Sequence, residues 1–149
     1  GEEGLHFRLL RRLLLERGFD YGAFPAHDGL WEAAQKTSGD LLGRLAIAPM
    51  ILEARGLDVT PGLIRKLQGI GDHAAVEVLE RIYRDEIGHV RIGVRWFTTL
   101  VSERGGDAEE TFSRLVSQYY PAGPKPPFNV WARDRAELPQ DWYEGVVQS

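Results

Sequence analysis

The chain has 149 residues, of which 43% are hydrophobic and 27% are charged, and its formal net charge is −4. These values are typical of one soluble globular domain with a buried core, and they exclude an intrinsically disordered chain. The sequence contains no apolar run of about 20 residues, so no membrane-spanning helix is predicted. The acidic balance argues against nucleic acid binding over the whole surface but leaves a local basic patch, and with it tRNA, open. Because there is no cysteine, any metal ligands must be His, Asp or Glu, which suit iron, manganese or zinc.

Hydrophobic periodicity predicts helices along most of the chain. Apolar residues recur at spacings of three and four, and Gly or Pro separates one such segment from the next. In chain order the predicted helices are 2–17, 30–37, 41–55, 60–67, 72–101 and 107–119. A Pro-rich stretch then opens a weakly helical segment, 121–149, which we expect to pack as a tail on a helical bundle formed by 1–120. Since no alternating pattern predicts a strand, the expected fold class is all-α.

Local signals predict where several of these helices begin and end. Gly18 is expected to end the first helix, and a loop rich in Gly, Pro and aromatic residues follows over 19–29. Pro49 is expected to interrupt and kink the third helix and Gly56 to end it, whereas Pro61 suits the first turn of the next helix. Aspartates are expected to cap four of the helices at their starts: Asp28, Asp40, Asp72 and Asp107.

Two Glu-x-x-His motifs place a carboxylate and an imidazole on the same face of a helix. Glu86 and His89 lie within a stripe of the longest predicted helix that is otherwise made of Leu79, Ile82, Gly93, Phe97 and Leu100. Glu3 and His6 hold the matching positions in the first helix. A buried carboxylate is costly unless it is paired or binds a metal, and side chains one turn apart can reach the same ion. Both motifs therefore indicate metal ligands.

Glu53 adds a third carboxylate, on a predicted helix between the two motifs. Three Glu and two His are most of the ligand set of a dinuclear carboxylate centre in a four-helix bundle, which requires one more Glu. Carboxylates can bridge two metal ions, and the His ligands leave positions open for dioxygen or water. We therefore expect two metal ions, which could be iron, manganese or zinc, in a four-helix bundle that lacks its first helix, because the remaining Glu is expected before Gly1.

Each of these ligands also has a simpler interpretation. Glu3 could be solvated near the end of its helix, and Glu86 and His89 could form a buried hydrogen-bonded pair without metal. Glu53 could pair at the surface with Arg55 or a nearby lysine. These alternatives stay open at the level of sequence.

Asp85 directly precedes the second motif and has two interpretations. It could accept the free ring N–H of a ligand His from a neighbouring helix, or it could pair with Arg81 or Arg84. His27 is expected to form a hydrogen bond within its loop, and His73 to lie at the surface. Among the other residues, we expect core packing for Tyr83 and Trp96 and a solvated basic face formed by Arg8, Arg11 and Arg12.

Several long stretches resemble the uncharacterised ferritin-like family called domain of unknown function 455: YGAFPAHDGLWEAA, APMILEARGLDVTPG, IYRDEIGHVRIGVRWF and KPPFN. The resemblance runs from Glu3 to about Trp142. In that family the first motif usually reads Glu-Ala-x-His, and here it is Glu-Gly-Leu-His, which keeps both ligands. The resemblance implies a ferritin-like bundle with a di-iron or similar dinuclear centre, in a superfamily of ferritins, oxygen-dependent hydroxylases and tRNA-modifying hydroxylases. It also implies a preceding helix with a further Glu ligand.

Three functions follow as expectations. The first is an oxygen-dependent oxidase or hydroxylase that acts on a small-molecule substrate, for which a channel lined by Trp31, Tyr83 or Trp96 would be a favourable sign. The second is iron binding or ferroxidase activity, and the third is a non-enzymatic helical scaffold. We expect a cytoplasmic protein without membrane association, which forms homo-oligomers or associates with a missing N-terminal helix.

Overall fold

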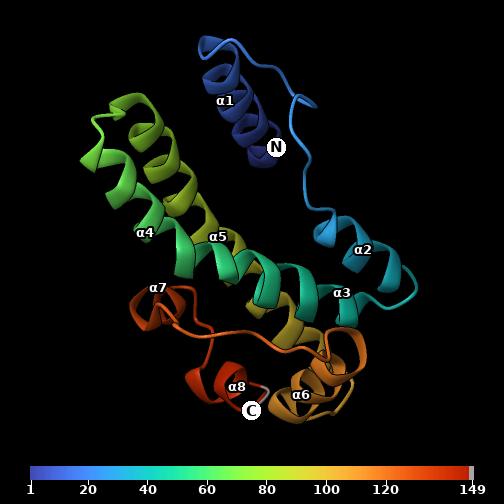
Figure 1. Ribbon diagram of the computed structural model, residues 1–149. Helices are drawn as coiled ribbons and strands as arrows, with labels where there is room; N and C mark the ends of the chain where they lie inside the picture. Colours follow the sequence, from blue (N-terminus) through green and yellow to red (C-terminus); the bar gives the residue numbers. More distant parts are fainter. Residues whose placement is uncertain (148–149) are drawn as a thin grey trace.

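The computed structural model describes residues 1–147, which form helices joined by turns and loops, without a strand in that range. The all-α prediction is confirmed. In chain order (Figure 1) the elements are α1 (Glu2–Glu16), α2 (Gly29–Lys36), α3 (Leu41–Ile47), the π-helix η1 (Ala48–Glu53), α4 (Ala54–Gly69), α5 (His73–Glu103), α6 (Ala108–Tyr119), α7 (Val130–Arg135) and α8 (Gln140–Glu144).

Helices α4 and α5 lie side by side and form the centre of the molecule (Figure 1). Gly71 has φ of 75°, a left-handed conformation that glycine adopts without strain, and it makes the tight turn between the two helices. Asp72 then caps α5, because its carboxylate accepts a hydrogen bond from the backbone N–H of Ala75. The predicted stripe of α5 is inward-facing: Phe97 is fully buried, and none of the other stripe residues is exposed.

The interruption expected at Pro49 is present, but it takes the form of a π-helix. Residues 48–53 make one widened turn between α3 and α4 instead of a kinked α-helix. The Pro49 ring lies against Gly93 of α5, where an added Cβ would be 2.5 Å from Pro49 Cγ. Glycine at this position therefore allows η1 to approach the middle of α5 closely, and η1 ends at Glu53.

Two local predictions in this region are wrong. Helix α4 does not end at Gly56, and no separate helix begins at Thr60, because α4 continues through Gly56 and Pro61 to Gly69. Packing along α5, which buries Leu57 among other residues, outweighs the local preference of Gly and Pro to end a helix. Asp28 is in the predicted position before α2, but its side chain makes no capping hydrogen bond.

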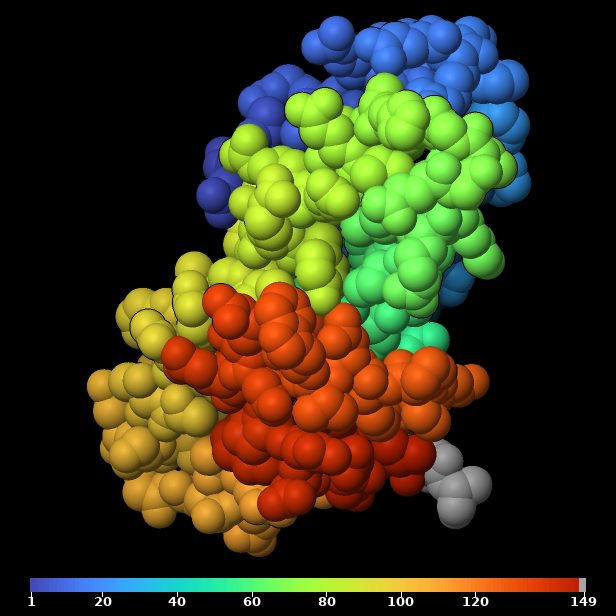
Figure 2. Space-filling model, turned by 90° about the vertical axis from the view of Figure 1, so that its left-hand side faces the viewer, coloured from blue at the N-terminus to red at the C-terminus, as the bar shows by residue number. Residues whose placement is uncertain are grey.

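The segment after α6 packs against the centre of the molecule. It covers the lower part of α4 and α5 as a continuous orange and red layer (Figure 2). Arg133 of α7 and Asp58 of α4 form a wholly buried ion pair, with Nε–Oδ1 and Nη2–Oδ2 distances of 2.9 and 2.7 Å. Asn129 donates hydrogen bonds to the Tyr83 hydroxyl and to the carbonyl oxygen of Leu57. These contacts hold the segment in place beside the core.

Helix α1 runs antiparallel to α5, since Arg17 pairs with Asp72 and His6 pairs with Asp85 farther along α5. The three arginines Arg8, Arg11 and Arg12 are exposed on α1, as predicted. Large apolar side chains such as Phe7 and Leu10 are also exposed. Within residues 1–147, no helix is long and apolar enough to cross a membrane.

Candidate metal centre

Helix α5 contributes Glu86 and His89 from successive turns. Both side chains are largely buried, with exposed fractions of 16% and 18%, and Glu86 Oε2 lies 3.4 Å from His89 Nδ1. Burial and the charge of Glu3 raise the pKa of Glu86. Burial lowers the pKa of His89, but the hydrogen bond to Glu2 and the surrounding carboxylates, Glu86 first among them, raise it more, so the pKa lies above the ordinary value.

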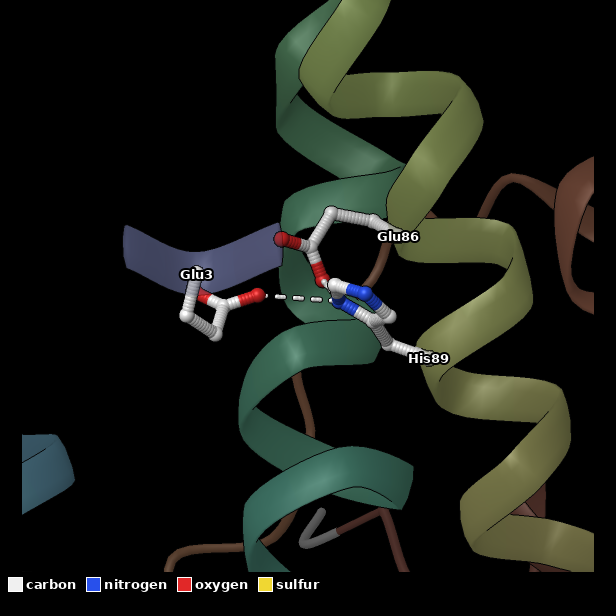
Figure 3. A group of neighbouring side chains, drawn as sticks. All are labelled: Glu3, Glu86 and His89. Atoms are coloured by element: carbon white, nitrogen blue, oxygen red, sulfur yellow. Dashed lines mark ion pairs between the residues drawn. The ribbon is translucent and has the colours of Figure 1, made fainter. Parts of the chain in front are cut away.

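Helix α1 contributes Glu3 and His6, which face the α5 pair across the helix interface. His6 is 5% exposed, whereas the side chain of Glu3 is 71% exposed. Glu3 Oε1 lies 3.0 Å from His89 Nδ1, and Figure 3 shows this carboxylate pointing at the His89 ring. The structure thus brings both predicted motifs together, in a group that we call the cluster: Glu3, His6, Glu86 and His89.

The donor atoms of the cluster are close enough to share a cation. One ligand atom from each of Glu3, Glu86 and His89 lies within 4.8 Å of the other two. Nδ1 of His6 is 3.4 Å from Glu3 Oε1 and 3.6 Å from Glu86 Oε1. Carboxylate oxygens and imidazole nitrogens at such distances are suitable ligands for iron, manganese or zinc.

Two buried atoms of the cluster lack hydrogen-bond partners within residues 1–147, namely Nδ1 of His6 and Oε2 of Glu86. A buried polar atom without a partner costs about 1–3 kcal/mol, and more when it is charged. A cation held between these atoms would satisfy both. A hydrogen-bonded pair of Glu86 and His89 without a metal would leave both of these atoms without a partner.

A carboxylate from the opposite helix orients each imidazole. His6 donates from Nε2 to Asp85 of α5 (3.0 Å), and His89 donates from Nε2 to Glu2 of α1 (2.9 Å). Both rings therefore present Nδ1 to the cluster, as expected for ligand histidines whose other nitrogen is held by an acid. Asp85 makes both of the predicted contacts, because it also accepts a hydrogen bond from Arg81.

Glu2 is the residue at the cluster that sequence reasoning missed. The signal was present, because each motif is preceded by an acid: Glu2-Glu3 before His6 and Asp85-Glu86 before His89. The importance of that first acid was recognised only in the second motif.

Glu53 faces the cluster from η1. Burial is the main cause of the raised pKa of Glu53, and the charges of Glu86 and Glu3 raise it further. Within residues 1–147 Glu53 forms no ion pair with Arg55. The Arg55 guanidinium donates instead to the backbone oxygen of Lys125. A cavity of about 300 Å³ opens beside the cluster and is lined by Gly1, Glu2, Glu3, Glu53, His89 and Ile92.

The remaining candidates lie away from this cavity. His27 accepts a hydrogen bond at Nδ1 from the Gly29 N–H, and His73 is exposed, as predicted for both. The prediction of core packing is confirmed for Tyr83. It is wrong for Trp96, whose side chain is 58% exposed because it lies one position along the helix from buried Phe97 and points to a different face. Neither tryptophan of the expected channel, Trp31 or Trp96, lines the cavity, and Tyr83 does not line it either.

The geometry defines a helical protein with a carboxylate and histidine cluster between two helices. The chain belongs to the family described as protein of unknown function DUF455, whose model matches residues 1–144. It is 45% identical over 151 residues to an uncharacterised protein of Haemophilus influenzae. That match covers 99% of this chain and 52% of the relative, so the chain spans about half the length of the curated relative. No solved structure matches the chain.

Proposed function

We propose that the chain is a ferritin-like dinuclear metal protein in which Glu3, His6, Glu53, Glu86 and His89 bind two metal ions. Iron is favoured over manganese and zinc. The observation that carries the proposal is that two buried atoms, Nδ1 of His6 and Oε2 of Glu86, have no hydrogen-bond partner within residues 1–147, although the carboxylate of Glu3 lies 3.4 Å from that Nδ1. A structural polar core would be expected to satisfy these atoms within the protein.

The residues of the cluster have separable roles in this proposal. Bound iron would supply electrons for the reduction of dioxygen. Asp85 and Glu2 hold the imidazoles in the tautomer that leaves Nδ1 free for a metal. Glu3 is exposed enough to change its orientation, whereas Glu86 is held by burial. Such a combination of one adaptable and one fixed carboxylate suits a centre whose metal ions change oxidation state.

An oxygen-dependent oxidase or hydroxylase is the function that we favour. The cavity beside His89 and Ile92 gives a small-molecule substrate access to the centre. Iron binding with ferroxidase activity is the second candidate. It is favoured by the three carboxylates at the mouth of the same cavity, Glu2, Glu3 and Glu53, which would attract a cation.

The ligand count also has a consequence for partners. A complete centre of this type uses four Glu and two His, and the chain brings together three and two. We propose that a further helix, from another polypeptide segment or a second copy of the chain, brings the fourth Glu to the open cavity. The exposed apolar residues Phe7, Leu10 and Ile92 are suitable contacts for such a helix.

Metal titration of the purified chain tests this proposal. We expect about one to two ferrous or cobaltous ions per chain under anaerobic conditions. Glu86→Gln and His89→Ala should each lower the affinity by at least about tenfold. Glu77→Gln and His73→Ala change exposed residues of the same helix and are the matched controls. Unchanged metal binding in the Glu86 and His89 variants would refute the site.

Oxygen consumption then separates the two candidate functions. Repeated turnover of ferrous iron with dioxygen and no cosubstrate would favour iron handling. Oxygen uptake that depends on an added small molecule would favour an oxidase or hydroxylase. A non-enzymatic scaffold requires neither of these reactions. Full stability and unchanged partner binding of the metal-free protein would support this third function.

A further inference from the structure

A second cavity, of about 260 Å³, lies on the other side of η1 from the cluster, between the loop before α2 and the segment after α6. Apolar side chains form much of its wall, including Leu30, Leu52 and Tyr120. Three cationic side chains also line it: Arg55, Lys125 and Arg133. No carboxylate is among its lining residues within the described range, 1–147.

Arg133 lines this cavity, and its side chain is held in place by its neighbours. Its guanidinium is fully buried, and it lies 4.8 Å from the centre of the Phe128 ring and 4.4 Å from that of Tyr143. Nε and Nη2 are both used by Asp58. Nη1 has no hydrogen-bond partner within residues 1–147. Because the guanidinium is planar, Nη1 points away from the carboxylate that holds the other two nitrogens.

Cationic side chains outnumber carboxylates among the lining residues of the cavity and their ion-pair partners. Asp58 is the carboxylate that contacts this group, and it pairs with Arg133 and lies 3.6 Å from Arg55. Three cations line the cavity, and one carboxylate, that of Asp58, forms ion pairs with two of them. His27 adds a further donor at the rim, because its Nδ1 accepts from Gly29 and its proton is therefore on Nε2.

We propose that this cavity binds a small organic anion, with a carboxylate or phosphate head held by Arg133, Arg55 and Lys125. Its apolar body packs against Leu30, Leu52 and Tyr120. An oxyanion supplies the acceptor that Nη1 of Arg133 lacks and neutralises the local positive charge. A buried arginine that is fixed before the ligand arrives loses little side-chain entropy on binding, which favours a specific site.

Calorimetric titration with four probes tests the proposal: benzoate, phenyl phosphate, inorganic phosphate and benzamide. Benzoate or phenyl phosphate is expected to bind with Kd below about 1 mM, and the comparison of the two identifies the preferred head group. Neutral benzamide should bind at least about tenfold more weakly, because it lacks the charge. Equal binding of benzamide and benzoate, or no binding of either anion at 10 mM (about ten times the expected Kd), would overturn the proposal. Inorganic phosphate that binds as tightly as phenyl phosphate would show an adventitious anion site.

Variants of three residues that line the cavity locate the binding. Arg55→Gln and Lys125→Gln should each weaken binding by roughly tenfold. Leu30→Glu places a carboxylate at the wall of the cavity and should prevent binding. Arg65→Gln and Lys66→Gln are the matched controls and should bind like the unchanged chain. If Arg55→Gln, Lys125→Gln and Leu30→Glu all bind normally, the anion is not in this cavity.

The Glu86→Gln variant keeps this proposal separate from the proposed function. A metal centre could itself bind a carboxylate, so anion binding must persist in this variant, whose metal affinity is expected to be low. Loss of anion binding in Glu86→Gln would assign the anion to the metal centre and refute the second site. Metal binding and anion binding can thus fail independently.

Discussion

His6 of α1 and Asp85 of α5 are joined by a hydrogen bond of 3.0 Å between residues 79 positions apart in the chain. The reciprocal bond, from His89 of α5 to Glu2 of α1, is 2.9 Å long. Each Glu-x-x-His motif therefore depends on the other helix for the orientation of its imidazole.

Replacing Asp85 by Asn tests this dependence. The amide of the Asp85→Asn variant carries no charge, so the His6 ring loses the charged acceptor that fixes Nδ1 toward the cluster, although every metal ligand remains. We expect metal affinity to fall by about 10–100-fold. Asp134→Asn changes an exposed acid of α7 and should have no effect on metal titration. Normal affinity in the Asp85 variant would mean that the hydrogen bond has no role in metal binding.

Glu53→Gln is expected to have opposite effects on stability and metal binding. The pKa of Glu53 is raised by burial and by the charges of Glu86 and Glu3, so its ionised form is unfavourable in the metal-free fold. Removing the charge should raise the urea midpoint of the metal-free chain at pH 7 while it lowers metal affinity. A lower midpoint together with unchanged metal binding would place Glu53 outside the centre.

Metal affinity should increase with pH in mildly acidic solution. Ligation requires ionised Glu53 and Glu86 and neutral His89, and the pKa of each of these groups is raised. We expect at least about a tenfold gain per unit between pH 5 and pH 6, with proton release on binding. Titrations at several pH values and in two buffers of different ionisation enthalpy would measure it, and a flat profile would contradict it.

The metal-free chain should show the opposite trend in stability. A raised pKa in the folded state means that the fold binds the proton more tightly than the unfolded chain does. The contribution of His89 is therefore fully present below about pH 6.5 and is lost as the pH rises through its folded pKa. Urea unfolding in the presence of a chelator would reveal this trend.

Gly93 and Gly88 form a matched pair on α5. An added Cβ at Gly93 would lie 2.5 Å from Pro49 Cγ, whereas nothing lies within 4 Å of an added Cβ at Gly88. Gly93→Val should destabilise the fold by about 1–3 kcal/mol and weaken metal binding, because it displaces η1 and Glu53. Gly88→Ala should stabilise it by about 0.5–1 kcal/mol. Urea unfolding of both variants checks the difference.

The Arg133–Asp58 pair should be essential for stability. Both side chains are almost completely buried, so Arg133→Leu leaves the Asp58 carboxylate buried without its main partner. We expect a loss of about 3–5 kcal/mol in the free energy of unfolding. Arg95→Gln breaks a largely exposed pair with Glu137 and should cost less than about 1 kcal/mol. Similar losses for the two variants would contradict this ranking.

Sequence periodicity was sufficient to find most of the cluster. Glu86 and His89 interrupt an apolar stripe, and the same spacing at Glu3 and His6 predicted that the two motifs face the same site. Asp85 was recognisable because it adjoins a ligand. The role of Glu2 was not recognised, because an acid at a helix start is usually only solvated.

Long-range packing explains what the sequence did not predict. Gly56 and Pro61 are local signals for helix ends, but burial of α4 along α5 overrides them. The Arg133–Asp58 pair joins residues 75 positions apart, and neither charge carries a pattern that names its partner. Pro49 marked the correct position of a break, whereas the widened turn depends on space provided by Gly93 in another helix.

The widened turn of η1 determines the direction in which the Glu53 side chain leaves the helix. A π turn holds one residue more than an α turn, so the side chains after it are rotated relative to an uninterrupted α-helix. Without this π turn, the same residues wound as an uninterrupted α-helix would place Glu53 and all of α4 about 100° away about the helix axis. Glu53 would then leave the cluster without any residue having been substituted, whereas deletion of one residue between Ala48 and Leu52, with return of the turn to α geometry, should keep Glu53 in place.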